Sequence, residues 1–161
     1  KIMSLYRFPV RPMRSCALRT AGLSSAKAAT FGMVRRNADG SPRAHQGVDL
    51  AMDNGYRVYA VDKGTVIDVR RGGNGYGFIV NLKINKSLYA FYAHLSDIRV
   101  SVGDIVSAGT CIGLTGSTGN AKGMIDEAHG GHLHFEVRTA SAVGLGLAGR
   151  ADPLSFFNLD E

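Results

Sequence analysis

Short segments of β-type composition, separated by turns that contain glycine, follow one another from residue 57 to residue 138. Glycine suits such turns because it has no Cβ and adopts positive φ at little cost, and 21 of the 161 residues are glycine. We expect strands at residues 57–61, 64–70, 76–84, 87–95, 98–100, 105–107, 111–115 and 132–138. Asp152 and Pro153 fit the N-cap and first position of a short terminal helix through Phe157. The pattern predicts an all-β fold, a compact antiparallel β-sandwich or open barrel.

The length of 161 residues suits a single domain with a core large enough to fold without disulfides. We expect the domain at residues 31–161 and a basic segment at residues 1–30 that packs on it or leads into it. No apolar run approaches the roughly 18 residues that span a bilayer, so no transmembrane segment is expected. The sequence starts at Lys1 without an initiator Met, which favours a domain of a larger polypeptide.

The positive charge is concentrated near the start of the sequence. Residues 1–43 hold nine Lys or Arg and one acid, a net +8, whereas the whole chain has a net charge of +6. Such a segment suits an anionic partner, which could be a cell-wall polymer, a membrane surface or nucleic acid. A solvated basic surface without a dedicated partner is equally consistent with the charge.

Two cysteines, Cys16 and Cys111, are too few to predict a disulfide framework. They either pair in an oxidising compartment or stay as two thiols. Cys111 lies in an apolar stretch, which favours a buried free thiol.

The segment His132-Leu133-His134-Phe135-Glu136-Val137 alternates polar and apolar residues. Alternate side chains of a strand share a face, so the apolar side chains would pack into the core and fix the register. The polar side chains then share the opposite face, where two imidazoles are available for metal binding or catalysis. The alternative is a polar stripe that faces solvent.

A second histidine segment is His45-Gln46-Gly47-Val48-Asp49. Gly47 and the β-branched Val48 favour a loop that leads into a strand over a helix. Imidazole nitrogen and carboxylate oxygen both bind zinc at about 2 Å. Taken alone, however, the pair is better explained as a surface ion pair or a capping contact.

A third histidine lies near the end of an aromatic segment, Tyr89-Ala90-Phe91-Tyr92-Ala93-His94-Leu95. Strand alternation puts His94 on the face of Tyr92 and Ala90, with Phe91, Ala93 and Leu95 on the more apolar side. By itself this pattern favours a hydrogen-bonded core histidine over a catalytic one.

In their order and flanking residues, these segments resemble the lysostaphin/LytM-type zinc metallopeptidases, which cleave peptide bonds in peptidoglycan. The resemblance runs from about Phe31 to Phe157. It rests on Phe31-Gly32, His45 to Leu50, Val58 to Val61, Gly64 to Val66, Gly75 to Gly77, Tyr92 to Ser96, Val102 to Val106, Ile112-Gly113, Gly116 to Gly119, His132 to Glu136 and Asp152 to Leu154.

The resemblance implies that His45, Asp49 and His134 bind Zn²⁺, and that His94 and His132 are catalytic histidines that do not bind the metal. Three protein ligands leave a fourth position for water, as expected of a catalytic site. We expect His132 to take the proton of the attacking water and His94 to donate to the developing oxyanion, although the two roles could be exchanged. Glu136 is either a partner that orients an imidazole or an ordinary surface charge.

Two insertions, at residues 120–131 and 139–150, depart from the family pattern and leave substrate specificity open. The first is expected beside the substrate groove, with His129 as an exposed loop residue rather than a metal contact. Some members of the family place a tyrosine ahead of the first ligand, and residues 37–43 contain none.

The implied activity is hydrolysis of stem or cross-bridge peptide bonds in bacterial peptidoglycan, by a monomer in the cell envelope, in the periplasm or outside the cell. The alternatives are an amidase that cuts between glycan and stem peptide, and a peptidoglycan-binding or activator module without turnover. Housekeeping remodelling and an antibacterial toxin domain delivered by a secretion apparatus both fit. Nucleic-acid binding is not expected, because the sequence lacks a recognisable reading motif.

Overall fold

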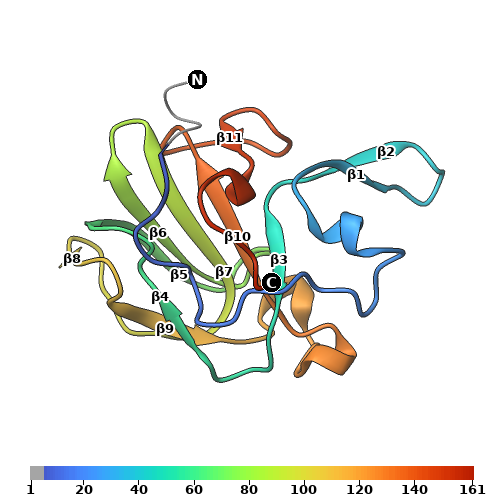
Figure 1. Ribbon diagram of the computed structural model, residues 1–161, viewed down its shortest axis with the longest axis horizontal. Helices are drawn as coiled ribbons and strands as arrows, with labels where there is room; N and C mark the ends of the chain where they lie inside the picture. The colour runs from blue at the N-terminus through green and yellow to red at the C-terminus, as the bar shows by residue number, and fades with distance from the viewer. Residues whose placement is uncertain (1–5) are drawn as a thin grey trace.

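Strands make up nearly all of the regular structure in the computed structural model, which describes residues 6–161 (Figure 1). The strands are β1 (Gly32–Arg36), β2 (Pro42–His45), β3 (Val48–Ala51), β4 (Arg57–Tyr59), β5 (Gly64–Arg71), β6 (Phe78–Asn85), β7 (Leu88–Ile98), β8 (Ile105–Val106), β9 (Cys111–Thr115), β10 (His132–Arg138) and β11 (Arg150–Ala151). Among the described residues the helical elements are 3-10 turns of three or four residues: η2 (Ala26–Ala29), η3 (Gly119–Ala121), η4 (Glu127–His129) and η5 (Pro153–Ser155).

The main sheet has the hydrogen-bonded order β11-β10-β7-β6-β5-β8, with β3 paired to β10 and β9 paired to both β7 and β4. The strands β1 and β2 form a separate hairpin, which extends from the body at the right of Figure 1. All of these pairings are antiparallel. The predicted all-β antiparallel fold is therefore confirmed.

The apolar core lies against one face of β10 and β7. Leu133, Phe135 and Val137 are fully buried, as the alternation in this strand predicts. Phe135 lies directly opposite Tyr92 of β7, and their ring centroids are 5.1 Å apart. Full burial of one such side chain contributes about 1.5–3 kcal/mol to stability, so a one-residue slip of β10 would be strongly unfavourable.

Residues ahead of β1 pack against the sheet. The backbone N–H of Phe8 donates to the carbonyl of Phe156 at 2.8 Å, and Leu18 forms an isolated bridge with Leu50 of β3. The Phe8 ring stacks on Phe156 with centroids 5.0 Å apart. These contacts agree with packing of the basic segment on the domain, while the division at residue 30 stays a prediction.

The differences from the expected elements are local. Residues 98–100 do not form a separate strand, because Ile98 ends the long β7. The hairpin β1–β2 and the short β11 were not expected, since arginine-rich or two-residue segments carry no clear strand pattern. The terminal helix is the single turn η5, with the Asp152 side chain accepting from the Leu154 N–H at 3.0 Å.

Both cysteines are free thiols, and Cys16 is buried, whereas Cys111 is only partly buried. The expectation of a free thiol at Cys111 is confirmed, but that of a buried one was wrong, because β9 is covered incompletely at that residue.

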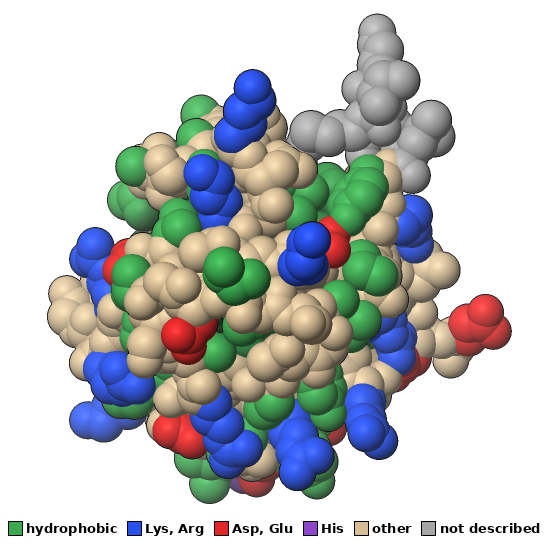
Figure 2. Space-filling view, turned by 90° about the vertical axis from the view of Figure 1, so that its left-hand side faces the viewer, with side chains coloured by type: hydrophobic (Ala, Val, Ile, Leu, Met, Phe, Trp, Pro, Cys, Tyr) green, Lys and Arg blue, Asp and Glu red, His purple; other side chains and the backbone are tan. Residues whose placement is uncertain are grey.

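The described residues contain no helix long and apolar enough to cross a membrane. On the face shown in Figure 2, Lys and Arg side chains are scattered among acidic, hydrophobic and other side chains. Several arginines of the N-terminal segment also pair within the chain; Arg11, for example, donates to Asp160 at 2.7 Å. Part of the basic charge near the start of the sequence is thus balanced internally.

We predict that Phe8→Ala lowers the free energy of unfolding by about 3 kcal/mol, because it leaves a cavity between Phe156 and Phe135. Urea denaturation measures the change. The control Ile105→Ala, at a side chain 80% exposed, should stay within about 0.5 kcal/mol of the parent. A loss below about 1 kcal/mol for Phe8→Ala would mean that the segment around it is not part of the cooperative fold.

Candidate metal centre

Asp49 and His134 come together because they are directly opposite residues of the neighbouring strands β3 and β10. His45, the last residue of β2, lies at the same point because only the bend at residues 46–47 separates it from β3. One ligand atom from each of the three residues lies within 4.8 Å of the others. His45 Nε2 and His134 Nδ1 are each 3.0 Å from Asp49 Oδ1.

The remaining ring nitrogens of the two histidines are held by hydrogen bonds. His45 Nδ1 donates to the Thr30 carbonyl at 2.9 Å, and His134 Nε2 donates to Glu136 Oε2 at 2.8 Å. In a neutral ring, each bond selects the tautomer whose other nitrogen faces the cluster with its lone pair and can bind a metal. Burial lowers the pKa of His134, but its hydrogen bonds with Asp49 and Glu136 raise the value to about 9, so this ring also binds a proton that a metal would displace. Glu136 is therefore a partner that orients an imidazole, and it is fully buried rather than a surface charge.

The donor set fits zinc. Two imidazole nitrogens and one carboxylate oxygen are ordinary zinc ligands, and bonds of 2.0–2.1 Å in a tetrahedral site put neighbouring ligand atoms roughly 3.3 Å apart. The observed separations of 3.0 Å are close to that value. A carboxylate and two imidazoles buried at one point are also difficult to explain as a structural contact alone.

The second oxygen of Asp49 is held by two arginines. Arg35 of β1 donates to Oδ2 at 2.8 Å, and Arg19 of the N-terminal segment donates at 3.2 Å. Burial by itself would raise the pKa of Asp49, but the hydrogen bonds from His134 and His45 and the nearby His132 hold it well below its usual range. Asp49 is therefore ionised, with Oδ1 directed at the histidines.

His94 reaches the site through an unusual backbone conformation. Alternation predicts that it shares the face of Tyr92, which lies in the main core. Instead His94 has φ +60°, a left-handed value that is uncommon for residues other than glycine. This turn brings the imidazole beside His132, with ring centroids 5.1 Å apart, and returns Leu95 to the main core. The predicted faces of His94 and Leu95 were therefore wrong.

His94 and His132 are held in the same way. Each Nδ1 lies 2.8 Å from a backbone carbonyl, that of Thr118 for His94 and that of Gly130 for His132. Each Nε2 is therefore left unprotonated in the neutral ring. Burial is the main cause that lowers the pKa of His132 and lowers that of His94 to about 4, so both rings are neutral at neutral pH.

Glycines allow the close backbone contact that holds His94. Gly77 has φ +70°, and a Cβ there would lie 2.4 Å from the Thr118 hydroxyl oxygen. Gly119, with φ +67°, would meet the Gly75 carbonyl at the same distance. A side chain at either position would push Thr118 away from the imidazole.

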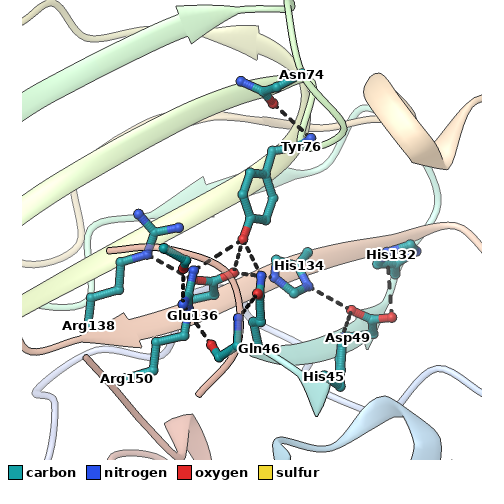
Figure 3. A network of polar contacts seen from close by, with 12 residues as sticks. His45, Gln46, Asp49, Asn74, Tyr76, His132, His134, Glu136, Arg138 and Arg150 are labelled. Carbon is teal, nitrogen blue, oxygen red and sulfur yellow. Dashed lines mark hydrogen bonds and ion pairs between the residues drawn. The ribbon is translucent and has the colours of Figure 1, made fainter. Parts of the chain in front are cut away.

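A network of charged groups surrounds Glu136 (Figure 3). Arg138 and Arg150 donate to Oε1 at 2.8 and 2.7 Å, and the Tyr76 hydroxyl donates to Oε2 at 2.9 Å. Burial would raise the pKa of Glu136, but His134 and the arginines lower it far below its usual value. The predicted alternative of a solvent-facing stripe on β10 is thereby excluded, because this polar face is enclosed by charged partners.

An open cavity of about 950 Å³ lies over the cluster, and Asp49 and four of the five histidines line it. The insertion at residues 120–131 contributes Asn120, Ala121 and Met124 to the wall, as expected. His129 of this insertion is 69% exposed, pairs with Asp126 and lies outside the cluster.

The insertion at residues 139–150 forms another part of the wall through Leu145 and Gly146. Arg150 holds it in place by donating to the carbonyls of Gly144 and Gly146, each at 2.7 Å. Gln46, next to His45, accepts from the Gly146 N–H at 2.5 Å.

Several residues around the site were not singled out from the sequence. Tyr76 supplies a phenol beside His134, although residues 37–43 contain no tyrosine, and it lies within the Gly75-Tyr76-Gly77 segment on which the resemblance partly rests. Arg138 shares the alternation of Glu136, which could have indicated a same-face pair. Arg19 and Arg35 carry no local signal, because they lie 30 and 14 residues before Asp49.

An antiparallel β fold with two imidazoles and a carboxylate at the base of an open cavity has the features of a metal-dependent hydrolase. The model for peptidase family M23 matches residues 43–144. The glycyl-glycine endopeptidase ALE-1 of Staphylococcus capitis is 37% identical over 101 residues, 60% of this chain and 25% of the relative. The murein hydrolase activator NlpD of Salmonella dublin is 30% identical over 127 residues, 79% of this chain and 32% of the relative.

The solved catalytic domain of lysostaphin, an antimicrobial peptidase from Staphylococcus simulans, has a TM-score of 0.63 and 30% identity. The match covers 78% of this chain and 86% of that domain. The chain therefore belongs to peptidase family M23, a family of zinc metallopeptidases. It spans 25% and 32% of the lengths of the two curated relatives.

We predict that Arg150→Ala lowers the free energy of unfolding by about 3 kcal/mol, because Arg150 and Glu136 are 1% and 0% exposed and the carboxylate would lose a buried partner. The matched control is Arg99→Ala, whose ion pair with Asp97 is about half exposed and whose loss should cost within about 0.5 kcal/mol. Chemical denaturation of both variants tests this. Equal effects would mean that the Glu136 network does not stabilise the fold.

Proposed function

We propose that this chain hydrolyses peptide bonds in the stem or cross-bridge peptides of bacterial peptidoglycan, with Zn²⁺ held by His45, Asp49 and His134. The observation that carries the proposal is the convergence of these three ligand atoms within 4.8 Å at the base of a cavity. The likeness to a glycyl-glycine endopeptidase supports peptidase activity on cell-wall peptides.

When bound, zinc would polarise the scissile carbonyl and lower the pKa of a water molecule to about 7. His132 is the residue best suited to move the proton. Its Nε2 makes no hydrogen bond with any residue from 6 to 161 and lies 3.7 Å from Asp49 Oδ2. Burial lowers the pKa of His132, and the charge of Asp49 opposes that effect. Its Nε2 takes a proton and then donates it to the leaving amine.

His94 lies beside His132 and lines the same cavity. To donate to the developing oxyanion it needs a proton on Nε2, which burial opposes in the free protein. The negative charge of the transition state would raise its pKa and allow this protonation. The exchange of roles between the two histidines is the alternative assignment.

A module without turnover is the second candidate function, because the chain resembles a murein hydrolase activator over 79% of its length. The complete set of three ligands and two neutral histidines favours the enzyme. Among the enzymatic alternatives, an amidase that cuts between glycan and stem peptide would use the same site residues, since that bond and a peptide bond are both amides.

We place the activity in the bacterial envelope, in the periplasm or outside the cell, where peptidoglycan lies. An antibacterial role, as a lytic domain of a larger polypeptide or one delivered by a secretion apparatus, is part of this proposal, as is a monomeric state. The antibacterial role is supported by the likeness to lysostaphin, an antimicrobial peptidase.

The site assignment predicts two classes of variant. His45→Ala and Asp49→Ala should lose zinc, whereas His94→Ala and His132→Ala should keep about one zinc per chain and lose turnover roughly a hundredfold or more. Metal analysis after dialysis and assays of the same samples separate the classes. Unchanged zinc content in the first pair would refute the ligand set, and full turnover in either member of the second would remove that histidine from the mechanism.

Mass spectrometry of purified sacculi incubated with the zinc-loaded protein tests the function itself. We expect cut stem or cross-bridge peptides, and none in a chelator-treated control. Release of whole stem peptides from the glycan would instead identify an amidase. Intact sacculi in both samples would contradict hydrolysis and favour the activator module.

A further inference from the structure

Two arginines face one another on the β1–β2 hairpin. Arg35 of β1 and Arg43 of β2 are direct partners in the antiparallel register, so both side chains lie on the same face of the hairpin. Both residues line the cavity over the metal centre. The hairpin is thus one wall of this cavity, and that wall is cationic.

Only one of the two arginines is compensated within the chain. Arg35 donates to Asp49 Oδ2 at 2.8 Å and to the Ala28 carbonyl at the same distance. Arg43 is exposed, and its guanidinium makes no hydrogen bond or ion pair with any residue from 6 to 161. The charge of Arg35 is thus already paired with a carboxylate of the chain, whereas the charge of Arg43 is left for an anionic ligand in the cavity.

The charged residues that line the whole cavity also favour an anionic ligand. Among the described residues that line it, three are arginines and one is a carboxylate: Arg19, Arg35, Arg43 and Asp49. A divalent cation at the His–Asp–His cluster would add to this positive excess. A site with such a field attracts an anionic ligand and raises its local concentration.

We propose that the β1–β2 hairpin binds a carboxylate of the substrate peptide through Arg43, with Arg35 beside it, so that the protein selects peptides with a free carboxylate near the scissile amide. The guanidinium fork matches the two oxygens of a carboxylate, and a hydrogen bond to a charged group is stronger than a neutral one. This specificity rests on the proposed peptidase function, but carboxylate binding can be measured without turnover.

The test measures the affinity of a fluorescein-labelled stem peptide with free carboxylates and of the same peptide with every carboxylate converted to an amide. Fluorescence anisotropy on zinc-loaded His132→Ala protein avoids turnover. At low salt we expect the dissociation constant of the peptide with free carboxylates to be about tenfold lower than that of the amidated peptide. This preference should shrink as salt screens the charges.

Arg43→Gln in the His132→Ala background should reduce the preference to about twofold, mainly because it weakens the binding of the peptide with free carboxylates. Arg36→Gln is the matched control: it removes the same charge from the neighbouring position of the same hairpin, but Arg36 does not line the cavity. It should leave the preference unchanged.

Equal affinity for the two peptides, no measurable binding of either, or an equal effect of the two arginine variants would overturn the proposal. Turnover by protein with His132 intact is measured separately. If the preference and its loss in Arg43→Gln are found but no peptide is cut, the carboxylate site stands and the peptidase function fails. If both peptides are cut equally well and bound equally well, the function stands and the carboxylate site fails.

Discussion

The pairing of β10 with β3 on one side and with β7 on the other is the constraint on which the rest of the structure depends. It puts His134 opposite Asp49, and it puts Phe135 opposite Tyr92 in the core. Because side chains alternate between faces, the burial of the apolar residues of β10 fixes the position of its histidines. Stability and the geometry of the metal centre therefore have the same origin.

The polar face of β10 is also buried, which is costly unless each charged group has partners. Glu136 meets this requirement through two arginines, a phenol and His134, and Asp49 meets it through Arg19 and Arg35. The same contacts orient the ligand groups, since a carboxylate held at one oxygen presents the other. Partners supplied by the N-terminal segment, by β1 and by the start of β11 thus belong to the electrostatic support of the centre.

The cavity combines a floor that the sheet determines with walls that peripheral segments supply. Strands β3, β7 and β10 and the end of β2 supply the metal-ligand candidates and the two neutral histidines. The β1–β2 hairpin and the two insertions supply arginines, Met124 and Leu145 around them. Wall side chains such as Met124 and Leu145 can therefore change without altering the register of the sheet, whereas Arg35 belongs to the wall and also holds Asp49.

The sequence by itself determined the all-β class and most strands of the main sheet, because alternation and glycine turns are local. It also singled out the five histidine and aspartate positions of the proposed site, because the motif segments are specific. It did not determine the β1–β2 hairpin, the face of His94 or the partners of Glu136. The turn at His94 reverses alternation through one backbone angle, of φ +60°, which no composition signals. Arg19, Arg35 and Arg150 meet their carboxylates only after distant segments pack together. Local patterns fix which residues carry the chemistry, but only tertiary packing decides which charges hold them in place.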